Sequence, residues 1–268
     1  MKTAIEIIKD HFHFRTQLIK MARSDLVKTY RGAALGWLWA IIRPVVTIFV
    51  YWFAFSIGLR ISKDVSNYPF FLWLIAGVVP WFYMNDMITQ GTDCMRKYSY
   101  LITKMKFPVS TIPTFVSISK LIVNTILIVI VIIIYWAMGY PPDIYYLQIP
   151  FFTLLMYLFF TQWALFAAPI AAMSKDFSNL VKSFVFALFW LSGVLWDAEK
   201  VEIIWLRRFL MLNPVTFLVN SFRNTFVNKI WFWEQPKRFG YFLFFLLIMY
   251  MLSIWSYNRL RKEIPDVL

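Results

Sequence analysis

The chain has 268 residues, 60% of them hydrophobic and 21% aromatic, and a mean hydropathy of +0.63. Soluble domains hold about 45–50% apolar residues, so this composition excludes an ordinary soluble protein and predicts a polytopic membrane protein. The net charge is +13, but lysine and arginine are scattered between apolar stretches and form no long basic face. This distribution argues against nucleic-acid binding and indicates basic loops that face an anionic membrane leaflet.

The first part of the chain combines a charged leader with a long apolar segment. Residues 1–31 place apolar side chains at steps of mostly three or four, which predicts an amphipathic helix. This helix is either an interfacial helix on the cytoplasmic leaflet or simply a positively charged anchor. Residues 37–58 carry one charge, Arg43, and are long enough to cross a bilayer. Arg43 lies near the start of this span, where its side chain can reach back to the headgroups.

Five further segments have the length and composition of membrane spans, namely 69–89, 112–138, 149–173, 179–196 and 239–257. The basic stretch 91–111 predicts a short helix between two spans, which is either a docking element or an ordinary cytoplasmic loop. Residues 197–238 are too charged for a full crossing and too apolar for a free loop. We therefore expect short re-entrant helices there, hinged at Asn213-Pro214, in the outer half of the membrane.

The predicted fold class is all-α: a polytopic membrane protein with six transmembrane helices, an N-terminal interfacial helix and short re-entrant helices before the last span. The whole chain, 1–268, forms one transmembrane domain. With both termini cytoplasmic, lysine and arginine are more numerous in the inner segments than in the outer ones, as the positive-inside rule expects. The cationic segment 197–238 is an exception that a re-entrant placement would explain.

The reactive side chains argue against catalysis by this chain. No glycine is followed by lysine, so the Gly-Lys step of a phosphate-binding P-loop is absent. The two histidines, His11 and His13, do not face one another on a helix, and the single cysteine is far away in sequence, which argues against a metal site. Asp86 and Lys120 lie within spans, and we interpret both as structural, with Asp86 as the partner of a nearby cation.

Motifs along nearly the whole chain resemble one known family. They are Arg23 to Asp25, Lys28 to Gly32, Leu35 to Trp39, Arg43-Pro44, Ala76 to Phe82, Lys104 to Pro113, Asp176, Leu212 to Phe217 and Phe222-Arg223. Together they resemble ABC-2 type permeases that export lipid-linked cell-surface polymers. Within this family they look most like the wall teichoic acid exporter permease, with O-antigen and capsular polysaccharide exporters as relatives.

The resemblance implies a multi-pass protein of the plasma membrane that forms a homodimer and binds two copies of an ATP-binding cassette subunit. ATP and magnesium would be held by that subunit, with no cofactor and no metal on this chain. The substrate would be a polymer linked to undecaprenyl diphosphate. Residues 94–107 would form the coupling helix seated in the ATPase, through Arg96, Lys97, Tyr98, Tyr100 and Lys104.

The same resemblance implies roles for side chains near the first and fifth spans. Arg43, Arg31 and Arg23 would meet the lipid diphosphate, because a guanidinium makes bidentate bonds to phosphate oxygens. Alternatively, Arg43 only anchors its span to the headgroups. The lining of the conduit would come from Phe49, Trp52, Phe53, Phe186, Phe189 and Trp190. In so aromatic a protein, the alternative for each of these rings is simple packing.

Two other functions compete with polymer export. An ABC-2 permease for drugs or small lipids would share the predicted topology. A membrane-bound acyltransferase or glycosyltransferase would need a catalytic histidine or a carboxylate pair near the surface, and neither is evident. A gene for a separate ATPase beside this one would distinguish both permeases from the transferase.

Overall fold

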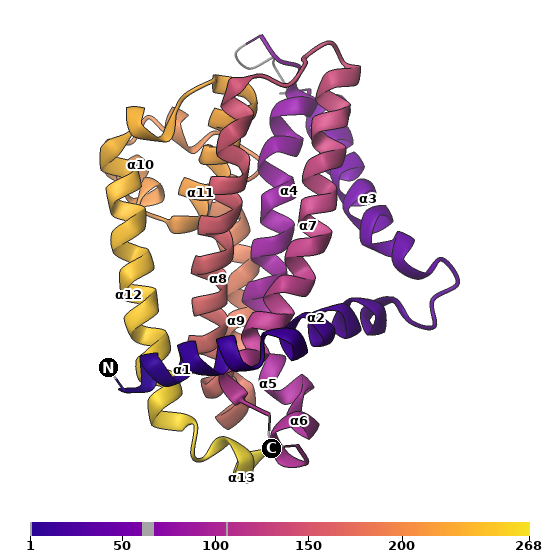
Figure 1. The fold of residues 1–268 in the computed structure, drawn as a ribbon. Coiled ribbons are helices and arrows are strands. Elements are labelled where there is room, and N and C mark those ends of the chain that lie inside the picture. Colours follow the sequence, from indigo (N-terminus) through magenta and orange to yellow (C-terminus); the bar gives the residue numbers. More distant parts are fainter. Residues whose placement is uncertain (1, 61–66, 106) are drawn as a thin grey trace.

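The computed structural model describes residues 2–60, 67–105 and 107–268, and the regular structure over these ranges is helical (Figure 1). Five helical segments are long and apolar enough to cross a membrane. They are Gly36–Gly58, Phe70–Thr89, Val109–Ala137, Ile144–Met173 and Pro236–Leu260. The prediction of an all-α membrane protein is therefore confirmed. The residues between the first two predicted spans, 59–68, lie largely outside the described residues, as does position 106 of the predicted coupling helix.

Helix α4 (Phe70–Thr89) forms the centre of the bundle. It packs against α7 (Ile112–Ala137), α8 (Gln148–Met173) and α11 (Pro214–Arg223). Its buried side chains run around the whole circumference from Leu72 to Ile88, as expected for a helix that is apolar on every face. Helix α12 (Pro236–Leu260) covers the outer side of α8 (Figure 1).

The first span stands apart from this centre. Helix α3 (Trp39–Phe53) is extended at both ends by short turns, so that one continuous span covers Gly36–Gly58, close to the predicted 37–58. It lies obliquely at the edge of the bundle (Figure 1), and its outer face exposes Val45, Val46, Phe49, Val50, Phe53 and Ile57. An apolar face of this kind requires lipid or another apolar surface around it.

The predicted leader helix consists of two helices, α1 (Lys2–His13) and α2 (Arg15–Tyr30), which run crosswise over one end of the bundle (Figure 1). Phe14 separates them. Leu18 and Ala22 of α2 are buried, and α2 packs against α7, whereas Ile5, Ile8 and Phe12 of α1 are more than half exposed. The apolar face of α1 therefore points away from the protein, as it does in a helix that rests on a membrane surface.

The predicted coupling helix 94–107 is also two short helices, α5 (Cys94–Lys97) and α6 (Ser99–Thr103), broken at Tyr98. They lie at the same end of the bundle as α1 and the short C-terminal helix α13 (Ile264–Val267), together with both chain termini (Figure 1). The placement of both termini on the cytoplasmic side stays a prediction.

The predicted fifth span, 179–196, is only partly matched by α9 (Lys175–Leu191), a helix of 17 residues. It begins earlier than expected because the Ser174 side chain accepts a hydrogen bond from the Phe177 backbone N–H, which caps the helix. It ends before Gly193, whose φ of +63° breaks the helix. With α9 shorter than the five candidate spans, the count of six spans stays a prediction.

Two short helices occupy the segment between α9 and α12, as the sequence predicts. They are α10 (Ile204–Met211) and α11, and the turn between them is fixed by Asn213, whose Oδ1 accepts a hydrogen bond from Val215 N at 2.9 Å. Helix α11 is buried against α4, α8 and α12. The expected re-entry of this segment into the membrane stays a prediction.

Candidate functional site

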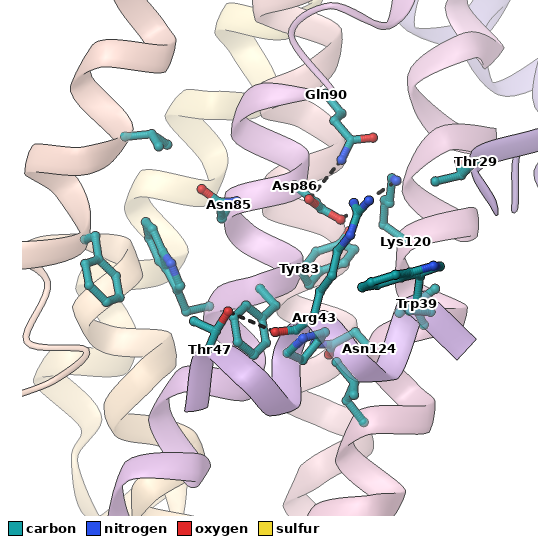
Figure 2. Close-up of a pocket in the computed structure, with 18 of the residues that line it drawn as sticks. Thr29, Trp39, Arg43, Thr47, Tyr83, Asn85, Asp86, Gln90, Lys120 and Asn124 are labelled. Carbon is teal, nitrogen blue, oxygen red and sulfur yellow. Dashed lines mark hydrogen bonds and ion pairs between the residues drawn. The ribbon is translucent and has the colours of Figure 1, made fainter. Parts of the chain in front are cut away.

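A cavity of about 560 Å³ opens near the end of the bundle that α2 crosses (Figure 2). Five helices line it, each with one face: α2, α3, α4, α7 and α9. The polar lining consists of Thr29, Arg43, Thr47, Asn85, Asp86, Gln90, Lys120 and Asn124. The aromatic lining consists of Tyr30, Trp39, Tyr51, Trp81, Phe82, Tyr83, Phe186, Phe189 and Trp190. The cavity therefore combines charge with flat apolar surfaces.

Arg43 projects from the first turns of α3 into this cavity (Figure 2). Its Cζ lies 5.7 Å from the ring centroid of Trp39, which is on the same helix one turn earlier. Among the described residues, no carboxylate lies within ion-pair distance of Arg43. The guanidinium fork is therefore available to an anion that enters the cavity.

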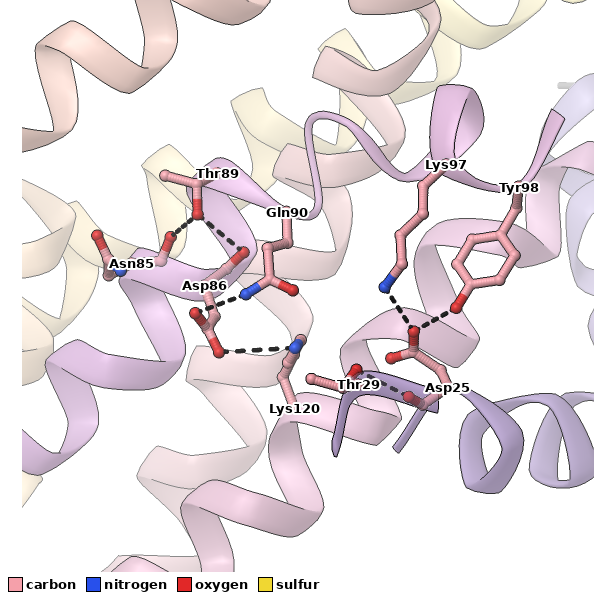
Figure 3. A network of polar contacts seen from close by, with 9 residues as sticks. All are labelled: Asp25, Thr29, Asn85, Asp86, Thr89, Gln90, Lys97, Tyr98 and Lys120. Atoms are coloured by element: carbon pink, nitrogen blue, oxygen red, sulfur yellow. Dashed lines mark hydrogen bonds and ion pairs between the residues drawn. The ribbon is translucent and has the colours of Figure 1, made fainter. Parts of the chain in front are cut away.

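A lysine and a carboxylate face each other on the opposite wall. Lys120 Nζ of α7 lies 3.8 Å from Asp86 Oδ2 of α4, and Gln90 Nε2 donates to Asp86 Oδ1 at 2.9 Å (Figure 3). One turn further along α7, Asn124 Nδ2 donates to the backbone oxygen of Val79 at 2.8 Å. The predicted pairing of Asp86 with a nearby cation is thus present, but the pair lies in the cavity wall.

The predicted conduit residues separate into two groups. Phe186, Phe189 and Trp190 of α9 line the cavity, and Phe189 packs at 5.6 Å from Tyr51 and 5.3 Å from Trp81 between ring centroids. Phe49, Trp52 and Phe53 lie on other faces of α3, outside this cavity; Phe49 and Phe53 are about half exposed. Their role in a conduit stays a prediction.

The helical repeat explains which residues of α3 reach the cavity. Arg43, Thr47 and Tyr51 are spaced four apart, so they form one stripe along the helix, and all three line the cavity. Tyr51 was not among the predicted site residues, although its helical spacing from Arg43 places both side chains on the same face of α3. Asp86 and Lys120 were noticed as intramembrane charges, which are a general signal of function.

The three predicted arginines do not come together. Arg31 follows α2 and Arg23 lies on the exposed side of that helix, and neither lines the cavity. Helix α2 contributes Thr29 and Tyr30 instead. Of the three, Arg43 alone reaches the cavity.

The short helix α5 and the Tyr98 that follows it are fastened to two neighbouring helices, α2 and α8. Asp25 of α2 accepts hydrogen bonds from Lys97 Nζ at 2.8 Å and from the Tyr98 hydroxyl (Figure 3). Arg96 donates to the backbone oxygens of Ala171 and Ala172 at the end of α8, at 2.5 and 2.9 Å. The Asp25 contacts join the predicted coupling segment to α2, which lines the cavity, and the Arg96 contacts join it to α8.

A second tether leads from the turn before α5 to α9. Asp93 accepts a hydrogen bond from Ser178 Oγ at 2.5 Å and forms an ion pair with Lys182 Nζ at 2.5 Å. Of the predicted coupling residues, Arg96, Lys97 and Tyr98 thus bind within this chain. Tyr100 also accepts a hydrogen bond from Lys28 Nζ at 3.3 Å, but both Tyr100 and Lys104 remain exposed on the outer side of α6.

The Asp25 contact is ionic at neutral pH. Burial opposes ionisation of this carboxyl, but the hydrogen bonds from Lys97 and Tyr98 outweigh burial and hold its pKa below the ordinary value of 3.8. The Asp25 side chain is fully buried, whereas Lys97 is 42% exposed. The ion pair between Lys97 and Asp25 therefore links an exposed side chain of α5 to a carboxylate buried where α2 packs against α7.

The groups that line the cavity are suited to binding a ligand. It offers two cations, one carboxylate, amide groups and aromatic rings, and it contains no histidine, cysteine or serine that could act as a nucleophile with a base. Across the described part of the chain, no three side chains of His, Cys, Asp or Glu are grouped as metal ligands would be. Such a donor set suits an anionic headgroup carried on an apolar chain.

Comparison with known proteins gives consistent results. A family profile described as "ABC-2 type transporter" matches residues 16–227. An O-antigen export system permease protein RfbA from Myxococcus xanthus is 24% identical over 223 residues, which cover 83% of this chain and 84% of the relative. An O-antigen export system permease protein RfbA from Klebsiella pneumoniae is 22% identical over 254 residues, 94% of each chain. The residues that the family profile matches include the cavity-lining residues of all five helices.

Proposed function

Because the chain belongs to the ABC-2 type transporter family, we propose that it is the membrane permease of an exporter for a lipid-linked cell-surface polysaccharide of the O-antigen class. Energy comes from a separate ATP-binding subunit, and the active assembly contains two permeases and two such subunits. The relatives named for O-antigen export support this polymer class over wall teichoic acid, which the sequence motifs led us to expect.

The observation that carries the proposal is the cavity that contains Arg43. Its guanidinium has no carboxylate partner among the described residues, and it lies beside aromatic rings that can stack on sugar or cover a lipid chain. A polymer carried on undecaprenyl diphosphate presents both groups at once. A permease for uncharged drugs or neutral lipids has no need of two cations at this position.

The partner subunit docks on α5 and α6. Tyr100 and Lys104 face outward there, next to Met105, which is 55% exposed. The contacts of Asp25, Asp93 and Arg96 hold this docking surface to α2, α9 and α8. Through these contacts, movement of the ATP-binding subunit is transmitted to α2 and α9, which both line the cavity.

Export by substituted permeases tests this proposal. The permease gene and its ATP-binding partner are expressed in cells that make the lipid-linked polysaccharide but lack their own exporter, and surface polymer is measured. We expect Arg43→Ala to abolish export and Arg43→Lys to restore it partly, because lysine offers one point charge in place of a fork. Arg31→Ala and Arg23→Ala should have smaller effects, since neither residue lines the cavity.

Arg208→Ala, on the exposed face of α10, is the matched control and should export normally. Co-purification with the ATP-binding subunit shows that each variant assembles. Normal export by an assembled Arg43→Ala variant would show that Arg43 does not recognise the substrate. The polymer class is tested with purified complex: ATPase stimulation by lipid-linked teichoic acid but not by lipid-linked polysaccharide would overturn it.

A further inference from the structure

We propose that Lys120 is a second anion-binding side chain in the cavity and that Asp86 is its internal counter-ion, which the phosphate of the incoming lipid carrier displaces. The inference rests on the proposed function, because the displacing anion is the phosphate group of that substrate. It assigns a role to two residues that a sequence interpretation leaves as a structural pair.

Lys120 is nearly buried, with 5% of its side chain exposed, yet its ammonium group is poorly satisfied. Its distance of 3.8 Å from Asp86 Oδ2 is longer than a hydrogen bond. A buried ammonium normally requires close hydrogen-bond partners, because it has lost its water shell. The N–H donors of Lys120 are therefore available to a closer oxygen inside the cavity.

Apart from the largely exposed Lys200–Asp197 pair at 3.6 Å, the other lysine–carboxylate pairs among the described residues show what a close contact looks like. Lys97 lies 2.8 Å from Asp25, and Lys229 lies 2.7 Å from Asp143. Both distances are those of charge-assisted hydrogen bonds. The Lys120–Asp86 pair is longer by about an ångström although it is the more buried on the lysine side.

Asp86 can release Lys120 without losing all its partners. Its side chain is 38% exposed toward the cavity, and its other oxygen keeps the hydrogen bond from Gln90 at 2.9 Å. A phosphate that approaches Lys120 within hydrogen-bond distance gains more Coulomb energy than the carboxylate at 3.8 Å provides. A change of partner therefore requires only movement of the lysine side chain.

Arg43 and Asn124 define the ligand further. Arg43 enters the cavity from α3 and Lys120 borders it on α7 (Figure 2), so one phosphate group would join the two walls. Asn124 Oδ1 is buried and accepts no hydrogen bond from the described residues. Two cations beside an unused acceptor fit a phosphate ester with a neighbouring hydroxyl, as in a sugar phosphate.

Binding of a soluble analogue tests the inference. The probe is geranylgeranyl diphosphate, titrated by calorimetry into the purified permease with its ATP-binding subunit, and geranylgeraniol is the uncharged reference. We expect Lys120→Met to weaken diphosphate binding about tenfold, as the loss of one charge-assisted hydrogen bond does. Asp86→Asn should tighten it several-fold, because the competing carboxylate is gone while the Gln90 hydrogen bond can remain.

The double variant Asp86→Asn/Lys120→Met separates counter-ion exchange from general repulsion. If Asp86 acts by occupying Lys120, the tightening caused by Asp86→Asn disappears once Lys120 is removed. The same tightening with and without Lys120 would overturn the inference. Asp143→Asn, which removes the carboxylate from another lysine pair, is the matched control and should leave diphosphate binding unchanged.

Two outcomes separate this inference from the proposed function. If Arg43→Ala abolishes the preference for diphosphate while the Asp86 and Lys120 variants bind as the original protein does, the inference fails and the proposed function stands. If the unaltered complex binds geranylgeraniol as well as the diphosphate, both fail. Should Asp86→Asn not assemble, Asp86→Leu carries the same expectation.

Discussion

Two buried cations in this protein are held in opposite ways. Arg223 of α11 is 2% exposed and donates to the backbone oxygens of Gly193 and Val194 at 2.7 and 2.5 Å. Its guanidinium also lies 3.5 Å from the ring centroid of Trp73. Lys120 is almost as deeply buried, but its one ion pair, with Asp86, spans 3.8 Å across a cavity wall.

The difference separates a structural cation from an exchangeable one. Backbone oxygens cannot move away without unfolding the turn after α9, so Arg223 ties that turn to α11 and α4 permanently. The neighbouring α4 residue is Gly77, and a Cβ there would lie 2.6 Å from Arg223 Nη2. Lys120 is paired with a side chain instead of the backbone, at the wall of a cavity, so its partner can change.

The largest expected effect is on Arg223. Arg223→Met should remove both hydrogen bonds to the turn and leave two backbone acceptors unpaired, at a cost of about 1–3 kcal/mol for each. We expect a strong fall in the melting temperature of the detergent-purified protein and poor recovery. Arg208→Met, on an exposed position, is the control. Equal melting temperatures for these two variants would contradict the assignment of Arg223 as a structural cation.

A smaller effect is expected when an added methyl group crowds the Arg223 guanidinium than when the guanidinium is removed. Gly77→Ala should displace the Arg223 guanidinium and cost about 1–3 kcal/mol, which is typical of overpacking. Gly240→Ala in α12 is the matched control, because nothing lies within 4 Å of its added Cβ. It should be neutral or slightly stabilising. A Gly77→Ala protein as stable as the Gly240→Ala protein would mean that Arg223 can shift as freely as a surface side chain.

The smallest effect concerns the ion pair between Asp25 and Lys97, which lies at the edge of the fold. Asp25→Asn should cost about 1 kcal/mol, because Lys97 is 42% exposed and water screens the pair. The pKa of Asp25 is lowered by folding, so its stabilisation is present above the unfolded pKa of about 3.9 and lost as the pH falls through the folded value. The difference in melting temperature between the two proteins should therefore shrink below about pH 4. A difference that grows with acid would contradict the ionic assignment.

The sequence by itself determined the class of this protein and most of its linear order. Apolar runs placed the spans because a bilayer requires about 20 apolar residues for each crossing. Capping and turn chemistry placed the hinge at Asn213-Pro214. The motifs around Arg43 and Arg223 indicated the family, which the match over residues 16–227 shows.

Tertiary structure alone decided which faces and which distant residues meet. A membrane helix is apolar toward lipid and toward its neighbours alike, so periodicity does not reveal its inner face. For this reason the cavity stripe of Arg43, Thr47 and Tyr51 could not be told from the stripe that bears Phe49 and Phe53. The pairing of Asp86 with Lys120 depends on how α4 packs against α7, which is set by the shapes of both helices together.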